Sequence, residues 1–289
     1  APTDYDRYAA ARIMAEEQRH GWQMAYLLMT YFGQQGRREA QKLLERNAQE
    51  GDRLLGAFHR PMTHWLDFFC YTMFVDRDGK FQLGMLSTSA FKPLAASMGP
   101  MLKEEAFHLG TGSNGLRRVI KAGVLPLDLL QRYINQWVST AHDLFGVDES
   151  SSAHWAYVWG VKGRWDERKK LEAGIEVSKE KLNEEARHHY HEEIVREVRK
   201  LCNYLPDDAP RLYVPHENFN REIGTYKRQR YTVEGTQFEG SDEEWNQYIE
   251  THLPTKQDEE DLKEYFKQQW VAEKPMTAKQ IASGIGAGA

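Results

Sequence analysis

The chain has 289 residues, enough to bury a sizeable core as one large domain or as a domain with an extension. Its net charge of −5, from 38 Lys and Arg against 43 Asp and Glu, excludes nucleic acid as a bulk electrostatic partner. The sequence has no membrane-length apolar stretch and no signal-peptide pattern, and Cys70 and Cys202 are too far apart to build a metal site. We therefore expect a cytoplasmic protein that binds neither membrane nor nucleic acid.

Residues 1–33 predict a short lead followed by a long helix, which ends at Gly33 and Gly36. This helix carries Glu17-Gln-Arg-His20, a Glu-x-x-His pattern that places a carboxylate and an imidazole on adjacent turns of one face. The pattern lies in register with an expected buried seam at steps of three and four residues, formed by Ile13, Glu17, His20, Met24, Leu27 and Tyr31.

A polar surface helix is expected over residues 37–48, and the following stretch is strongly apolar. Its seam at the same spacing consists of Met62, Leu66, Phe69, Met73, Asp76 and Leu83. Asp76 is the charged member of this seam, and two interpretations of it stay open. It is a metal ligand on a helix, or it belongs to a turn, because Asp76-Arg-Asp78-Gly79 has the composition of one.

A further helix begins at Lys92-Pro93 and carries a second Glu-x-x-His, Glu105-Ala-Phe-His108. Its expected seam is Leu94, Met98, Met101, Glu105 and His108, and the glycines of LGTGSNG predict its end. A buried carboxylate without a partner costs several kcal/mol, so each pair needs a strong partner. Two facing pairs can share a dinuclear metal site, whereas a single Glu-x-x-His is usually a solvated pair on a helix surface.

The rest of the chain is expected to cover and extend this core. An amphipathic helix is predicted over 126–146 and a long charged helix over 166–203, whose third copy, Glu185-Ala-Arg-His188, we interpret as a solvated face. After a Pro- and Asp-rich link we expect a short helix over 218–226, a possible strand pair (230–235 and 237–240) and a capped helix over 241–254. The predicted domains are a helical metal-binding domain, 1–204, and a C-terminal extension, 205–289.

The predicted fold class is all-α, with a ferritin-like four-helix-bundle core and a small mixed C-terminal extension. Carboxylates with imidazoles suit iron, manganese or zinc, and the type of ligand alone does not choose among them. A carboxylate-rich site with one His per metal favours a di-iron centre, in which Glu17, His20, Glu105, His108 and Asp76 are the candidate ligands. In such a bundle two equivalent halves supply matching ligands, so a sixth ligand, a carboxylate, is expected. It should lie roughly thirty residues before Glu17, on a first bundle helix that falls upstream of Ala1. Glu16 and Glu104 point about 100° away from their neighbours and are expected to support ligands or lie on the surface.

Several ordered blocks resemble a known family. AEEQRHGWQMAYLLMTYFG, FVDRDGKFQLGML and LKEEAFHLGTG are similar to blocks of the oxygenase component of benzoyl-CoA 2,3-epoxidases, and so are LPLDLLQRYINQW, VPHENFNREIG and DEEWNQYIETHLPT. The resemblance covers nearly the whole chain and is weakest over 166–203. It implies a ferritin-like di-iron oxygenase, with Glu17, His20, Asp76, Glu105 and His108 as the iron ligands. The family's first Glu ligand has no counterpart, because the chain starts too late.

The resemblance further implies an activity. Two irons activate O2, one oxygen atom enters the ring of benzoyl-CoA as the 2,3-epoxide, and the other leaves as water. Electrons come from NADPH through a separate flavin and iron–sulfur reductase, and we expect a monomer or weak oligomer. Two alternatives remain: a related di-iron oxygenase acting on another aryl-CoA thioester, and a ferritin-like metal-binding protein that is not an oxygenase.

Overall fold

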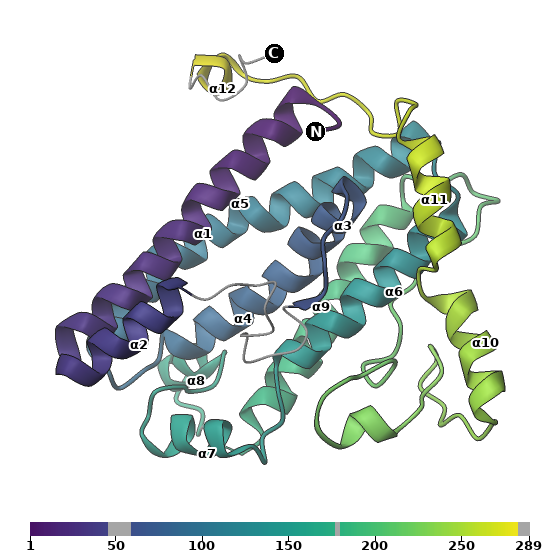
Figure 1. Cartoon of the computed structure of the whole chain (residues 1–289). Helices are drawn as coiled ribbons and strands as arrows, with labels where there is room; N and C mark the ends of the chain where they lie inside the picture. The colour runs from purple at the N-terminus through teal and green to yellow at the C-terminus, as the bar shows by residue number, and fades with distance from the viewer. Residues whose placement is uncertain (46–58, 177–179, 283–289) are drawn as a thin grey trace.

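Helices form nearly all of the regular structure in the computed structural model, which describes residues 1–45, 59–176 and 180–282 (Figure 1). The all-α, ferritin-like fold expected from the sequence is confirmed. In this described part, no helix is long and apolar enough to cross a membrane.

The first two helices, α1 (Asp4–Tyr31) and α2 (Gly33–Glu45), form an antiparallel hairpin along one side of the molecule (Figure 1). The Thr3 side chain caps α1 by accepting a hydrogen bond from the backbone N–H of Asp6. The predicted seam is correct at Ile13 and Leu27, which are buried, and wrong at Tyr31, which is 52% exposed. The part of the predicted second helix that lies beyond residue 45 is outside the described residues.

The next helical stretch is continuous but contains a π-helical turn. It runs through α3 (Trp65–Cys70), the π-helical turn η3 (Tyr71–Val75) and α4 (Asp76–Leu86). Asp76 is the first residue of α4, so the interpretation of this position as a turn is wrong. A π-turn takes more residues per turn than an α-helix, and it therefore changes the direction in which the following side chains point.

The longest helix, α5 (Lys92–Ala122), continues through the glycines that were predicted to end it. It ends at Gly123, whose φ of 65° is the left-handed conformation common after a helix. The internal glycines serve packing instead. A Cβ atom on Gly112 would lie 2.3 Å from the backbone N of Met73, and one on Gly115 would lie 2.3 Å from the Phe69 ring. The two glycines thus let α3 and η3 approach α5 closely.

The hydrophobic core lies between α3–α4, α5, α6 (Leu127–Leu144) and α9 (Leu182–Cys202). Its largest fully buried side chains include Trp137, Tyr133, Tyr190, Phe69 and Phe74. The helix predicted over 126–146 is confirmed as α6. The single helix predicted over 166–203 is wrong, because α8 (Glu167–Glu172) ends before Gly174, whose φ is 71°, and α9 starts only at Leu182.

The remaining elements lie around this core (Figure 1). They are α7 (Ser151–Val158), the 3-10 turn η4 (Gly224–Arg228), α10 (Asp242–His252), α11 (Lys256–Tyr265) and α12 (Ala278–Ala282). The predicted capped helix is confirmed as α10, with a capping box between Ser241 and Glu244. The helix predicted over 218–226 is only the 3-10 turn, and the possible strand pair is a single bridge between Tyr231 and Gln237.

Residues after 205 contribute to the main core: Leu212, Leu262, Trp270 and Val271 are buried in it. The division into domains at residue 204 stays a prediction.

Candidate metal centre

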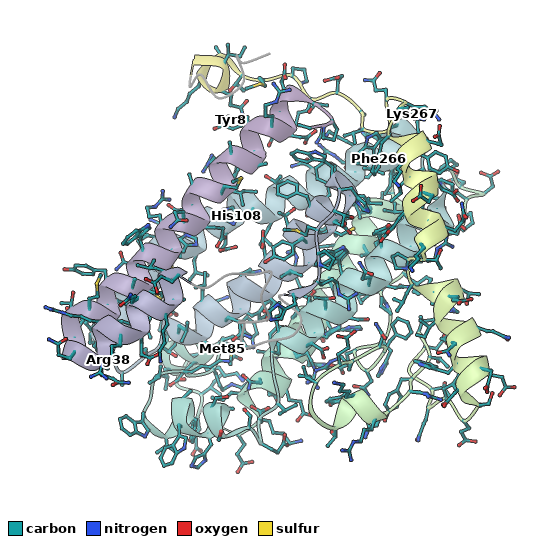
Figure 2. All side chains as sticks on the ribbon, in the orientation of Figure 1. Tyr8, Arg38, Met85, His108, Phe266 and Lys267 are labelled. Carbon is teal, nitrogen blue, oxygen red and sulfur yellow. The ribbon has the colours of Figure 1, made fainter. Side chains whose placement is uncertain are left out.

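The structure brings the five candidate ligands together, although they come from three helical segments. One of them, His108 on α5, is labelled in Figure 2. His108 Nδ1 lies 3.2 Å from Glu17 Oε1, 3.5 Å from Glu105 Oε2 and 4.0 Å from Asp76 Oδ2. His20 Nδ1 lies 3.7 Å from Glu17 Oε2 and 4.0 Å from Glu105 Oε1. Ligand atoms of Glu17, Glu105 and His108 all fall within 4.8 Å of one another. One small volume between α1, α5 and the start of α4 is therefore surrounded by three carboxylates and two imidazoles.

In each imidazole, the ring nitrogen that faces away from the cluster contacts a carboxylate of the other helix. Glu16 Oε2, on α1, lies 2.9 Å from Nε2 of His108, and Glu104 Oε2, on α5, lies 2.7 Å from Nε2 of His20. A carboxylate accepts this hydrogen bond only when Nε2 carries a proton, so in the neutral imidazole the lone pair is on Nδ1 and faces the cluster. This is how proteins orient metal-binding histidines. The supporting role expected for Glu16 and Glu104 has a structural basis.

Burial distinguishes the ligands. The side chains of His108, Glu105 and Asp76 are 0%, 7% and 10% exposed, whereas Glu17 is 50% exposed. The prediction of a buried Glu17 is thus wrong, because α1 has α5 on one side of it and an open groove on the other. Within the described part of the chain, Asp76 Oδ2, Glu105 Oε2 and His108 Nδ1 are buried without a hydrogen-bond partner. Buried polar atoms normally have partners, and three that converge on one point fit a bound cation.

The charges of the cluster perturb its pKa values. Burial works to raise the pKa of Glu17, but contacts with His108 and His20 outweigh it and lower that pKa to about 2. Burial works to lower the pKa of His108, but the nearby carboxylates of Glu105 and Glu17 raise it to about 10. The pKa of Asp76 is raised well above its ordinary value by burial and by the charge of Glu105. Without a metal, the cluster therefore holds protons that a cation would displace.

The π-turn η3 directly precedes Asp76 and aims it at the cluster. Thr72 lies within this turn, and its hydroxyl donates to the carbonyl of Phe68 at 2.8 Å. The turn packs against α5 at Gly112, one helical turn after His108. π-turns inside helices occur frequently at functional sites.

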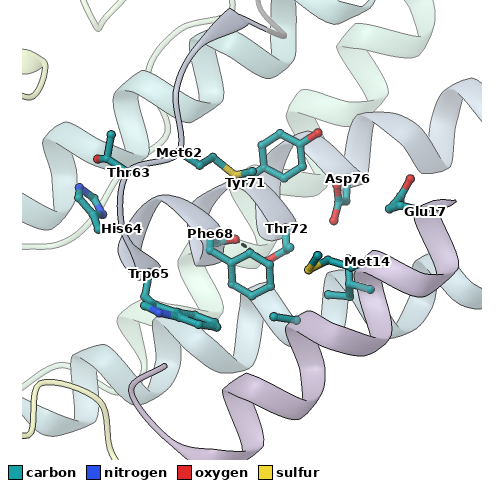
Figure 3. A pocket seen from close by; sticks show the side chains of 12 residues that line it. Met14, Glu17, Met62, Thr63, His64, Trp65, Phe68, Tyr71, Thr72 and Asp76 are labelled. Carbon is teal, nitrogen blue, oxygen red and sulfur yellow. Dashed lines mark hydrogen bonds between the residues drawn. The ribbon is translucent and has the colours of Figure 1, made fainter. Parts of the chain in front are cut away.

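A groove of about 670 Å³ leads from the surface to the cluster (Figure 3). One wall is α1, with Ala10, Ile13 and Met14, and the other is the stretch from Met62 to Thr72. Glu17 and Asp76 lie at one end of it, and Thr63, His64 and Trp65 lie at the other. Most of the lining between them is apolar.

The sequence did not predict the crossed hydrogen bonds, in which a glutamate of each helix contacts the histidine of the other. Both patterns contain two consecutive glutamates, Glu16-Glu17 and Glu104-Glu105, and this repetition was the available signal. It also missed Arg12, whose Nε donates to Glu16 Oε1 at 2.9 Å. The third copy behaves as predicted, since His188 is 60% exposed and Glu185 pairs with Arg164 instead of joining a cluster.

An all-α, ferritin-like fold with carboxylates and imidazoles converging between its helices defines a candidate metal protein with mixed carboxylate and histidine ligands. Comparison with known families agrees with this class. Residues 4–231 match the model of the phenylacetic acid catabolic protein family, and the chain belongs to that family.

One curated relative is the benzoyl-CoA oxygenase component B of Aromatoleum evansii. It is 35% identical over 302 aligned positions, which cover 89% of this chain and 63% of the relative. The chain thus spans less than two thirds of the length of that relative. The resemblance described from the sequence is supported by this match.

Proposed function

We propose that this chain is the oxygenase component of a di-iron enzyme that converts an aryl-CoA thioester, benzoyl-CoA, to its 2,3-epoxide. In the balanced reaction, O2, NADPH and a proton react with benzoyl-CoA, and the epoxide, water and NADP⁺ are formed. The observation that carries the proposal is the convergence of three carboxylates and two Nδ1 atoms on one point, with each imidazole held by a carboxylate of the other helix. The name of the relative supports the choice of substrate.

The proposed ligands are Glu17, His20, Asp76, Glu105 and His108. Oxygen and nitrogen donors in this proportion suit iron, and two bound irons supply the reductive activation of O2. Glu16 and Glu104 keep the Nδ1 lone pairs directed inward, and Asp76 and Glu105, which are buried, hold their carboxylates on the side of the centre away from the groove's open end.

The groove offers a place for a sixth, carboxylate ligand of the metal centre. Its walls are two helical stretches, its lining is largely apolar, and Met14 on its rim is 71% exposed. An amphipathic helix buries such a surface, and at this position its carboxylate would reach the end of the groove marked by Glu17 and Asp76.

The electron source is proposed to be a separate flavin and iron–sulfur reductase that uses NADPH. A relative that is named as one component belongs with at least one other, which supports a separate partner. The cytoplasmic location and the monomeric or weakly oligomeric state remain predictions.

The test begins with the iron content of the full-length protein. It continues with O2 consumption and product analysis in the presence of benzoyl-CoA, reductase and NADPH. We expect about two irons per chain and an oxygenated thioester. Glu105→Gln should lose most of the iron, whereas Glu185→Gln, a change in the exposed third copy, should retain it.

Other outcomes reassign the function. Iron without substrate-dependent O2 consumption would indicate a metal-binding protein that is not an oxygenase. Turnover of phenylacetyl-CoA or another aryl thioester, but not of benzoyl-CoA, would indicate the related oxygenase. Equal iron content in Glu105→Gln and in the unmodified protein would refute the site.

A further inference from the structure

The two halves of the candidate centre correspond residue by residue. Glu16, Glu17, Arg19 and His20 on α1 match Glu104, Glu105, Phe107 and His108 on α5. In the half that contains His20, the supporting carboxylate is Glu104, and a guanidinium nitrogen of Arg19 donates to its other oxygen. A chain of arginine, glutamate and histidine results.

The half that contains His108 cannot be built in the same way, because Phe107 stands where the first half has Arg19. The structure nevertheless has a guanidinium at this place, and it comes from Arg12 of the opposite helix. Arg12 Nε donates to Glu16 Oε1 at 2.9 Å, while Glu16 Oε2 faces His108 Nε2. The Arg12 guanidinium carbon lies 3.8 Å from the centre of the Phe107 ring. Phe107 thus provides an aromatic face on which the replacement arginine rests.

We propose that Arg12 is a positioning residue for His108, taking the part that Arg19 has for His20. The inference rests on the proposed function in one respect, namely that His108 holds a metal. By fixing one oxygen of Glu16, Arg12 directs the other at His108 Nε2 and so holds Nδ1 toward the cluster. Arg12 therefore affects metal binding through Glu16 and His108, without contacting the metal itself.

The simpler interpretation is an ordinary surface ion pair at i,i+4 spacing, which contributes about 0.3–0.5 kcal/mol to a helix. Three observations weigh against it. Glu16 is only 9% exposed, so the pair is not fully solvated. An arginine placed before its glutamate is the less favourable order along a helix. Stacking on Phe107, moreover, ties Arg12 to α5 and not only to its own helix.

The experiment compares Arg12→Met with the matched variant Arg19→Met in the metal-free full-length protein, titrated with Co²⁺ and followed by its visible absorption. Methionine keeps an unbranched stem on Phe107 but removes the donor. In the unmodified protein we expect two equivalents to bind. Each single variant should weaken one equivalent about tenfold, the lower end for partners of metal-bound histidines, and the double variant should weaken both.

A second change tests the correspondence itself. Phe107→Arg added to Arg12→Met rebuilds, in the second half, the arrangement of the first, and should restore the weakened equivalent. Cobalt binding by Arg12→Met that matches the unmodified protein would overturn the inference. So would equal weakening of both equivalents in that single variant, or no recovery in a helical Arg12→Met/Phe107→Arg protein. An unmodified protein that binds no cobalt would overturn the proposed function as well, which separates the two failures.

Discussion

The contact between η3 and α5 beside the candidate centre gives a sharp prediction, because two glycines of α5 differ in what surrounds them. A Cβ atom on Gly112 would meet the backbone N of Met73 at 2.3 Å and the backbone C of Thr72 at 2.6 Å. Ordinary contacts begin at about 3.4 Å, so η3 must move by roughly 1 Å, and backbone atoms cannot rotate away. A Cβ atom on Gly110 would meet nothing within 4 Å.

Gly112→Ala should therefore lower the free energy of unfolding by about 1–3 kcal/mol, the usual cost of overpacking. Gly110→Ala should raise it by up to about 1 kcal/mol, because alanine favours the helix. Denaturant unfolding of the two metal-free proteins measures the difference. Because η3 leads directly into Asp76, Gly112→Ala should also weaken metal binding, and Gly110→Ala should not. Equal stability of the two variants would show that the described contact between η3 and α5 is wrong.

Two further predictions concern pH and the C-terminal part. The pKa of His108 in the folded protein is about 10, above its ordinary value of 6.5. The protonated His108 therefore stabilises the folded, metal-free protein fully below pH 6.5, and this stabilisation is lost as the pH rises to about 10. Metal must displace the same proton, so Co²⁺ affinity should rise across this window; an affinity that does not change with pH between 7 and 9 would contradict the assignment. Trp270→Ala should lower the free energy of unfolding by about 3–5 kcal/mol, because Trp270 is buried against Phe266 and Phe69. Thermal unfolding checks this, and Trp159→Ala, at a side chain that is 72% exposed, is the matched control and should be near neutral.

The sequence predicted which residues meet, but not how they are held. The Glu-x-x-His spacing and its helical register were enough to propose Glu17, His20, Glu105 and His108, because both properties are local. The crossed bonds from Glu16 to His108 and from Glu104 to His20 depend on the relative placement of α1 and α5, which no local pattern encodes. The role of Arg12 depends in addition on Phe107, 95 positions later, as the sequence numbering shows.

The errors in the predicted helices have a common cause. Glycines were taken as helix ends in LGTGSNG, yet Gly112 and Gly115 lie inside α5, where tertiary contact with η3 and Phe69 outweighs their low helix propensity. Over 166–203 the reverse error was made. The charged composition suggested one helix, but the left-handed conformations at Gly174 and Lys181 separate α8 from α9. Propensity is a weak guide wherever a neighbouring helix decides the outcome.

The π-turn from Tyr71 to Val75 decides which way Asp76 faces. A π-turn holds one more residue than a regular turn, so residues 71–75 wound as an α-helix would leave Asp76 about 100° away from its present direction. The turn absorbs the extra residue, so the helix beyond it keeps its orientation relative to the helix before it. A related chain that lacks one residue at this point can therefore direct the same carboxylate at the cluster from a regular helix. Loss of the π-turn without loss of a residue should instead turn Asp76 away from His108.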